Sequence, residues 1–253
     1  MTSLAHNLLG HGPAFVWGHG LTSSRASEDK GGLFDWTPVT ENGRQVVRYD
    51  AAGHGETGGP PEPGTYAWPQ LATDLLALLD QLGLDRVDAG GASMGCASTL
   101  HAAVRAPDRF DRLVLVIPPT AWDTRPALAE QYETSASYVE REGKAAWLEA
   151  AAATQRPAIF ADLPPAPMAV DIPEDLLPSV LRGAAASDLP PAAAIARLEH
   201  PALILAWAGD PGHPESTAHR LGELLPNSEV RVASQLTDLF TWSEAIASFL
   251  QRL

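Results

Sequence analysis

Strand-like apolar runs alternate with amphipathic helical runs along most of this chain, and this alternation constrains the fold more than any other feature. Six short runs are bounded by turn residues, which is typical of strands that are buried on both faces. The six runs are Ala14–Gly18, Gln45–Asp50, Asp85–Ser93, Arg112–Pro118, Pro201–Trp207 and Glu229–Ala233. Alternation of this kind predicts an α/β fold with a doubly wound, mostly parallel sheet between two layers of helices.

Helical periodicity occupies the stretches between these runs. From Trp68 to Leu82, leucines recur three and four residues apart and form an apolar stripe on one face of a helix. We expect further helices over Met94–Val104 and Glu215–Leu225, and a last helix over Phe240–Leu253. These segments alternate with the strand-like runs, as a doubly wound sheet requires.

One long stretch departs from this rhythm. Residues 119–200 contain no convincing strand and are rich in Ala and Pro, yet they carry Leu, Trp, Phe and Ile side chains that need burial. We therefore expect residues 119–200 to form a helical cap inserted between two core strands. Residues 1–118 and 201–253 would then form the core. Insertions at the carboxyl ends of parallel strands commonly build the ligand pocket.

Composition narrows the classes of partner. The chain has 253 residues and a formal net charge of −14. A surface this acidic repels phosphate backbones and anionic lipid headgroups, so we expect neither nucleic acid nor a membrane as a partner. The sole cysteine cannot form an intramolecular disulfide, and the sequence shows neither a transmembrane run nor a signal peptide. We expect a cytoplasmic protein that acts on a small molecule and needs no metal or cofactor.

The segment Gly91-Ala92-Ser93-Met94-Gly95 matches the pattern G-x-S-x-G, and it joins a predicted strand to a predicted helix. A turn this tight strains the backbone of the serine, and larger side chains at the two glycine positions would collide. The pattern alone is also compatible with an ordinary tight turn. Its place between strand and helix favours Ser93 as an exposed nucleophile.

Three further segments, in the matching order, resemble those of α/β-hydrolase-fold enzymes with a serine nucleophile. Val16–Leu21 resembles the strand end that carries a His-Gly pair, and Asp50–Thr57 resembles the D-x-x-G-x-G turn of that family. Gly209–Pro214 resembles the loop of the catalytic acid. The resemblance covers nearly the whole chain, with the cap as its least defined part, and it implies the α/β-hydrolase fold.

The resemblance implies acyl transfer as the chemistry. Ser93 would attack a carbonyl carbon, and the backbone N–H groups of Leu21 and Met94 would form the oxyanion hole. Asp210 would orient a histidine and stabilise its imidazolium form. Asp210 also has a structural interpretation, because an acidic residue there could cap the helix that begins near Pro214.

The histidine that the family places after the last strand is missing from this chain. The segment Ser234–Asp238 follows that strand, and the last of the eight histidines is His219. A serine hydroxyl without a base is a poor nucleophile, and removing the base from another serine hydrolase lowered kcat by about 10⁶. The identity of the base is therefore the open question.

Three interpretations of this absence remain open. Another histidine could serve, with His213 as the best candidate because it shares the loop of Asp210. His19 is second because its neighbours form the oxyanion hole, although both histidines could instead have structural duties. The pocket could also catalyse a lyase, isomerase or cyclisation step, with the oxyanion hole stabilising an enolate. Finally, the chain could be a hydrolase-like binder that has lost turnover.

Aromatic residues near the predicted strand ends could wall a pocket. Trp122 and Trp207 are candidates for this role, as is His19, although core packing would explain the two tryptophans equally well. Our leading interpretation is the hydrolysis of a small, largely apolar ester or similar acyl substrate. Ser93 would be the nucleophile, with Asp210 and His213 as the acid and the base.

Overall fold

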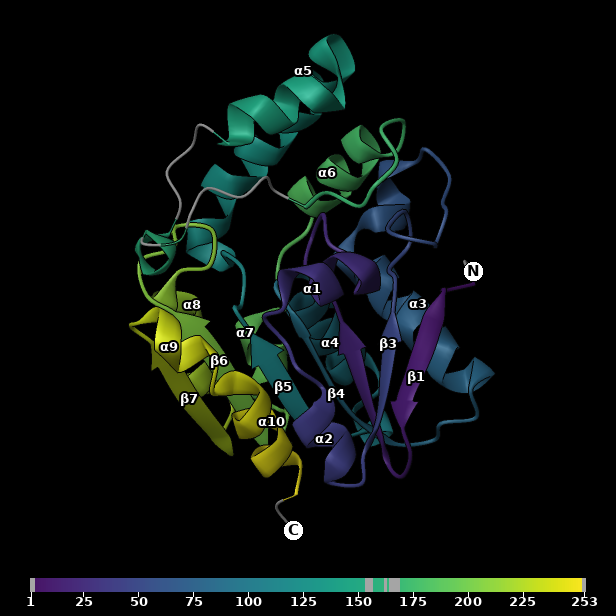
Figure 1. The fold of residues 1–253 in the computed structure, drawn as a ribbon, viewed down its shortest axis with the longest axis vertical. Helices are drawn as coiled ribbons and strands as arrows, with labels where there is room; N and C mark the ends of the chain where they lie inside the picture. The colour runs from purple at the N-terminus through teal and green to yellow at the C-terminus, as the bar shows by residue number, and fades with distance from the viewer. Residues whose placement is uncertain (1–2, 153–156, 162, 164–168, 252–253) are drawn as a thin grey trace.

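The core of the computed structural model is a single sheet, and the structure describes residues 3–152, 157–161, 163 and 169–251. Within these residues the sheet has seven strands in the order β1-β3-β2-β4-β5-β6-β7. The strands are β1 (His6–Gly10), β2 (Ala14–Gly18), β3 (Gln45–Tyr49), β4 (Val87–Ala92), β5 (Phe110–Val116), β6 (Ala202–Trp207) and β7 (Ser228–Ala233). β1 pairs antiparallel with β3, and the other neighbours pair in parallel. The predicted mostly parallel α/β sheet is confirmed (Figure 1).

Helices connect the parallel strands. They are α1 (Arg25–Gly31), α2 (Thr37–Glu41), α3 (Trp68–Gln81), α4 (Met94–Arg105), α5 (Arg125–Ala152), α6 (Leu177–Ala185), α7 (Ala192–Ile195), α8 (Glu215–Leu224), α9 (Leu236–Leu239) and α10 (Trp242–Leu250). The helices predicted over Trp68–Leu82, Met94–Val104 and Glu215–Leu225 agree with α3, α4 and α8 to within one residue at each end. The predicted last helix begins at Trp242, and residues 252–253 lie outside the described residues.

Both faces of the sheet are covered, and alternate strand residues face opposite sides. On β5, Leu113 and Leu115 belong to an apolar cluster that includes side chains of α3, α4 and α8. Val114 and Val116 belong to a second cluster, which includes side chains of α2 and α10. All four side chains are fully buried. This double burial explains why the strand sequences are continuous apolar runs rather than alternating ones.

The segment between β5 and β6 carries helices and no strand in its described part, and residues 153–156, 162 and 164–168 lie outside that part. Figure 1 shows α5 and α6 standing beyond one end of the sheet. The path of α5 is broken at Gly143, where φ is 85° and ψ is 165°. Beside the break, the Lys144 ammonium donates to the carbonyl oxygens of Val170 and Ile172 at 3.0 and 2.6 Å. The outer half of α5 is thereby tied to the chain that leads into α6.

Apolar periodicity does not reveal some N-terminal elements. β1 lies at the edge of the sheet and is only partly buried, so the segment His6–Gly10 lacks a continuous apolar run. The helix α1 is short and begins at a capping box, in which Ser24 and Ser27 exchange side-chain and backbone hydrogen bonds. Elements of this kind are defined by pairing and capping rather than by an apolar stripe.

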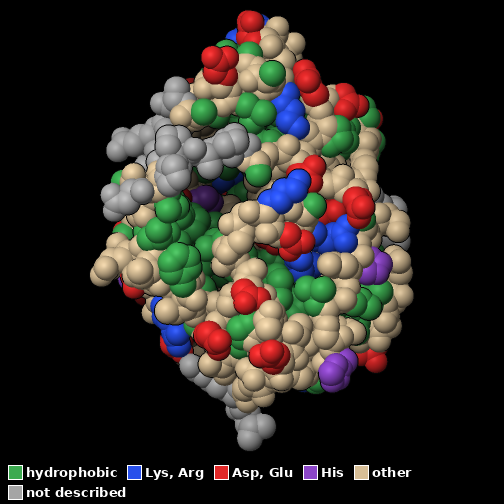
Figure 2. Space-filling view, viewed as in Figure 1, with side chains coloured by type: hydrophobic (Ala, Val, Ile, Leu, Met, Phe, Trp, Pro, Cys, Tyr) green, Lys and Arg blue, Asp and Glu red, His purple; other side chains and the backbone are tan. Residues whose placement is uncertain are grey.

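Acidic side chains do not gather in one patch on the face that Figure 2 shows. Asp and Glu are scattered there among apolar and neutral side chains. The formal net charge of −14 thus reflects many separate carboxylates. Within the described residues, none of the helices combines the length and the apolar character that crossing a membrane would need.

Candidate active site

The turn between β4 and α4 holds Ser93 in a strained conformation. Its φ of 51° and ψ of −105° lie outside the regions that residues with a side chain favour. The surroundings leave little room: a Cβ on Gly95 would lie 2.5 Å from the carbonyl carbon of Gly18, and a Cβ on Gly91 would lie 2.5 Å from that of Gly95. The two glycines of the motif therefore allow α4 to sit against the end of β2.

His213 lies in hydrogen-bond contact with the serine. Its Nε2 is 2.8 Å from Ser93 Oγ, and its Nδ1 is 2.8 Å from Asp210 Oδ2. With the proton on Nδ1, the imidazole donates to the carboxylate and accepts the hydroxyl proton through Nε2. The sequence left the base open, and the structure brings together the three residues of the leading interpretation.

A compact turn accounts for the contact between two residues that lie so close in sequence. The N–H of Gly212 donates to Asp210 Oδ1 at 2.8 Å, and the N–H of His213 donates to the Asp210 carbonyl oxygen at 3.2 Å. Gly209, with a φ of 74°, turns the chain out of β6. From the loop after β5, the Thr120 N–H donates to the Gly212 carbonyl oxygen at 3.1 Å. The turn therefore folds the imidazole back over the carboxylate.

Trp207, the last residue of β6, contacts the same pair. Its Nε1–H donates to Asp210 Oδ2 at 2.8 Å. Its ring meets the imidazole of His213 edge to face, with centroids 6.1 Å apart and planes at 86°. The sequence predicted Trp207 as a wall of the pocket, and the direction of its indole N–H toward the acid is a contact that the prediction did not include.

Hydrogen-bond donors surround the Asp210 carboxylate. Burial by itself would raise the pKa of this group, but the donors of His213, Trp207 and Gly212 outweigh burial and lower the pKa to about 2. The carboxylate is thus ionised at neutral pH and can stabilise an imidazolium. The side chain of Asp210 is 11% exposed and that of His213 is 24% exposed, so the acid is sheltered while the imidazole is more open.

The loop after β2 runs beside the serine. A Cβ on Gly20 would lie 3.8 Å from Ser93 Cβ, so the loop that carries Gly20 passes close to the serine. The Thr22 carbonyl oxygen accepts the N–H of Asp171 at 2.8 Å. Met94 is the first residue of α4, so its N–H has no partner within the helix. The N–H groups of Leu21 and Met94 remain the candidates for the oxyanion hole.

A family model described as the alpha/beta hydrolase fold matches residues 13–236, which is most of the chain. The chain belongs to the α/β hydrolase fold family. A relative named epoxide hydrolase 2, from Siraitia grosvenorii, is 33% identical over 106 residues, which make up 42% of this chain and 32% of that protein. The chain therefore matches about a third of the length of this relative.

Solved structures show the same fold over the whole chain. A hydrolase from Pseudomonas aeruginosa superposes with a TM-score of 0.82 at 24% identity, covering 99% of this chain and 95% of that one. An esterase from Thermogutta terrifontis gives a TM-score of 0.80 at 23% identity, with coverages of 99% and 93%. The predicted fold is confirmed, and the hydrolases among the relatives support the predicted enzyme class.

In this α/β hydrolase a carboxylate, and not an imidazole, follows the last strand. Asp238 lies in the short helix α9, and its Oδ2 accepts the N–H groups of Ser234 and Gln235 at 2.9 and 3.0 Å. The carboxylate thus caps the start of α9.

His19 ties two loops together. Its Nδ1–H donates to the Gly20 carbonyl oxygen at 2.8 Å, and its Nε2 accepts the N–H of Ala51 at 3.0 Å. The ring is 1% exposed, and burial lowers its pKa, so the imidazole is neutral. Because backbone groups occupy both nitrogens, the geometry favours the structural duty over a role as the base. Its role as a pocket wall stays a prediction.

Trp122 links the two ends of the segment between β5 and β6 by hydrogen bonds. Its backbone N–H donates to the Asp188 carboxylate at 3.0 Å, and its indole N–H donates to the Pro190 carbonyl oxygen at 3.1 Å. It also borders a surface cavity of about 460 Å³, on a side shared with Thr217 and Arg220 of α8. The structure therefore assigns Trp122 a tie between the two ends of the segment, and its role as a substrate wall stays a prediction.

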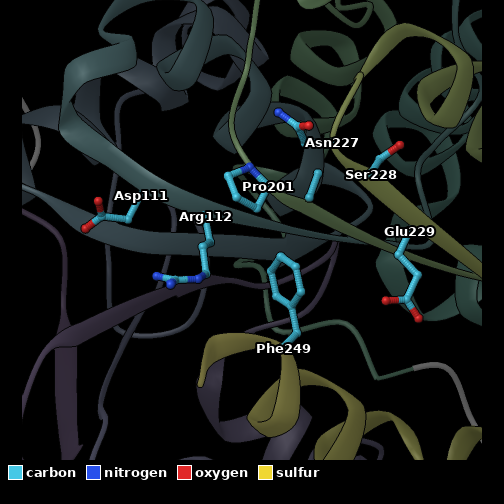
Figure 3. A pocket seen from close by; sticks show the side chains of 8 residues that line it. Asp111, Arg112, Pro201, Asn227, Ser228, Glu229 and Phe249 are labelled. Atoms are coloured by element: carbon cyan, nitrogen blue, oxygen red, sulfur yellow. The ribbon is translucent and has the colours of Figure 1, made fainter. Parts of the chain in front are cut away.

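A second cavity, of about 390 Å³, lies at the opposite end of the sheet (Figure 3). Arg112 at the start of β5, Pro201 before β6, Glu229 in β7 and Phe249 of α10 are among its lining residues. These positions are at the amino ends of strands, whereas Ser93 follows the carboxyl end of β4. Ligands of open α/β sheets bind at the carboxyl ends, so the cavity in Figure 3 is not the candidate active site.

Proposed function

We propose that this α/β hydrolase cleaves a small, largely apolar ester or a related acyl substrate through a serine nucleophile. Ser93 is the nucleophile, His213 is the general base and Asp210 is the acid that orients it. The observation that carries the proposal is the continuous pair of 2.8 Å contacts from Ser93 Oγ through the imidazole to the Asp210 carboxylate. A base supplied by the acid's own loop removes the objection that the usual histidine is absent.

Acylation follows from this geometry. Ser93 Oγ attacks the carbonyl carbon of the substrate while its proton passes to His213 Nε2. The imidazolium then keeps its Nδ1–H on the Asp210 carboxylate, whose negative charge stabilises it. Collapse of the tetrahedral intermediate breaks the bond to the leaving alcohol, and the proton on Nε2 moves to that oxygen. The product of this half is an acyl ester on Ser93.

Deacylation uses the same groups in reverse. His213 Nε2 takes a proton from water, and the oxygen of that water attacks the acyl carbonyl carbon. The second tetrahedral intermediate collapses by breaking its bond to Ser93 Oγ, which recovers its proton from the imidazolium. The carboxylic acid product leaves, and all three residues return to their starting protonation states.

The developing oxyanion needs donors that are already in place. In the proposal these are the backbone N–H groups of Leu21 and Met94, supplied by the loop after β2 and by the first turn of α4. The N-terminus of α4 also favours negative charge through the helix dipole. The loss of one oxyanion donor in another enzyme cost about 3–4 kcal/mol, which sets the scale of this contribution.

Apolar rings near the triad support an apolar acyl group. Trp207 touches His213, and Phe160 meets Trp207 edge to face at 5.0 Å between centroids. The alternative of altered or lost catalysis was motivated by the lack of a base, and an imidazole now lies 2.8 Å from Ser93 Oγ.

The proposal is tested with a serine-directed phosphonate probe and a small chromogenic ester. The wild type should be labelled at Ser93 and should hydrolyse the ester. His213→Ala should lower turnover by several orders of magnitude while the protein stays folded. His219→Ala is the matched control, because His219 is exposed on the neighbouring helix α8, and it should behave as the wild type. A folded wild type that is neither labelled nor active would refute the proposal.

A further inference from the structure

The indole of Trp207 shares an acceptor with the imidazole of His213. Both donate to Oδ2 of Asp210, each at 2.8 Å, while the Gly212 N–H holds the other oxygen, Oδ1, at 2.8 Å. Trp207 is 7% exposed and also meets the His213 ring edge to face. One side chain outside the acid–base loop therefore contacts both titratable members of the pair.

We propose that Trp207 is a positioning residue, whose indole N–H fixes the Asp210 carboxylate in the orientation that aims His213 Nε2 at Ser93 Oγ. This inference rests on the proposed serine hydrolase function, because it concerns the efficiency of the same reaction. It differs from the expected role of Trp207 as a pocket wall, since the contact that matters is with the acid and not with a substrate.

The need for an outside anchor follows from the shortness of the loop. Asp210 and His213 are held to each other by a single turn, so a rigid shift of that turn would move both groups together and leave their mutual contact intact. Only a contact from a fixed element can set the pair relative to Ser93. Trp207 supplies one, because it is paired with Ala233 of β7 within the sheet. Sites held by such rigid elements keep their geometry best.

The indole is itself locked in place. Its ring stacks on that of Trp242 from α10, with centroids 5.9 Å apart and planes at 10°. Phe160 meets it edge to face at 5.0 Å between centroids. The direction of the Trp207 N–H is therefore set by aromatic packing on two sides, and the carboxylate of Asp210 is oriented by a donor that cannot turn away.

Another titratable side chain that responds to the charge of Asp210 comes from the helical segment. Tyr132 of α5 is partly buried, and burial raises the pKa of its hydroxyl; the neighbouring Arg125 guanidinium opposes this increase, and the Asp210 charge adds to it. Tyr132 therefore stays neutral near neutral pH and the guanidinium of Arg125 stays charged, so neither group titrates in this range. A pH profile in this range then reports on the acid–base pair.

The test replaces the donor and keeps an aromatic ring. Trp207→Phe removes the indole N–H but can still pack against Trp242 and Phe160. Trp36→Phe is the matched control, because Trp36 is 6% exposed and packs against the rings of Phe15, Trp17 and Phe34 rather than against Trp207 or the acid. Circular dichroism and thermal unfolding establish that both variants fold, and ester turnover is then measured as a function of pH.

We expect Trp207→Phe to lower kcat by about ten- to a hundredfold with little change in KM, which is the scale for a lost hydrogen bond to a charged group. The acidic limb of the kcat/KM profile should move to higher pH, because a carboxylate with one donor fewer holds a proton on the imidazole more strongly. Trp36→Phe should show neither effect. A purely structural role would lower activity without moving the acidic limb.

A second measurement does not depend on the folding of Trp207→Phe. The chain has seven tryptophans, and their indole N–H signals can be compared in NMR spectra of the wild type and of Asp210→Asn. One indole signal should shift strongly when its charged acceptor becomes an amide. If no indole signal responds, the hydrogen bond is absent in solution and the inference is overturned.

The outcomes separate this inference from the function on which it rests. An active, labelled wild type together with a folded Trp207→Phe variant of unchanged kcat and pH profile overturns the role of Trp207 alone. A loss of kcat without the shift of the acidic limb does the same. A wild type that is neither labelled by phosphonate nor active overturns the serine hydrolase function, and the positioning role with it.

Discussion

Asp210 and His213 lie three residues apart on one loop, and Oδ2 of the first is 2.8 Å from Nδ1 of the second. The pair is thus built by a single turn after β6, while Ser93 comes from the turn after β4. In this arrangement the described segment after β7 contributes none of the three proposed catalytic side chains. Asp238 in that segment caps the start of α9. Two of the three proposed catalytic groups therefore depend on one short segment.

The first prediction concerns the acid of this pair. Asp210→Asn should lower kcat by about 10⁴, as the equivalent change did in another serine hydrolase, because the amide no longer fixes the imidazole tautomer or stabilises its charge. Steady-state ester hydrolysis measures the effect. Asp238→Asn is the control, since Asp238 is an acidic residue of α9 whose carboxylate accepts only local backbone N–H groups, those of Ser234 and Gln235. Equal activities of the two variants would contradict the role of Asp210.

The second prediction concerns the tight turn around the serine. Gly95→Ala should destabilise the protein by about 3 kcal/mol, the upper end for overpacking, since the added Cβ would lie 2.5 Å from the carbonyl carbon of Gly18. The ends of β2 and α4 would have to separate, so ester turnover should fall as well. Urea unfolding measures the decrease in the free energy of unfolding.

Gly31→Ala provides the comparison for this prediction. Gly31 is the last residue of α1, and a Cβ there would meet nothing within 4 Å. We expect its free energy of unfolding to change by less than about 1 kcal/mol. If Gly95→Ala were equally harmless, the close approach of β2 and α4 would not be the reason for the glycine.

Much of the fold is predictable from the sequence because both faces of the sheet are covered. Burial on two sides produces continuous apolar runs, and the six predicted runs all coincide with strands. The same reasoning does not predict the strand His6–Gly10, because this strand lies at the edge of the sheet and is only partly buried. The helix from Arg125 to Ala152 is hard to predict from apolar periodicity, since it is interrupted at Gly143 and has few buried residues.

The sequence predicts the part of the candidate site that a local pattern defines. It does not predict the part that depends on the directions in which side chains point. The G-x-S-x-G turn identifies Ser93 by itself. The choice between His213 and His19 depends on which way each ring points, and this is set by the turn at Gly209 and by the hydrogen bond from Ala51. The indole direction of Trp207 has the same character, although a tryptophan three residues before the acid is a signal that sequence reasoning can use.

The last prediction concerns His54, which is fully buried against His19 with ring centroids 5.0 Å apart. Burial, together with the neighbouring His19, lowers its pKa from 6.5 to about 3. Between these values the unfolded chain binds one more proton at this position than the folded chain. The contribution of His54 to stability is therefore fully present above pH 6.5 and declines as the pH falls toward 3, by about 1.4 kcal/mol per pH unit.

His54→Gln isolates this contribution, because a glutamine amide can still donate to the Ala52 carbonyl oxygen that Nδ1 contacts at 2.8 Å. The comparison is needed because Glu28 titrates with the opposite sign: burial raises its pKa from 4.5 to about 7, which favours the folded state as the pH falls through that range. Urea unfolding of both proteins below pH 6.5 should give free energies of unfolding whose slopes against pH differ by one proton, with the wild type becoming less stable relative to the variant as the pH falls. If the free energies of unfolding of the two proteins changed in parallel with pH, His54 would take up its proton as readily in the folded protein as in the unfolded chain, in conflict with its burial.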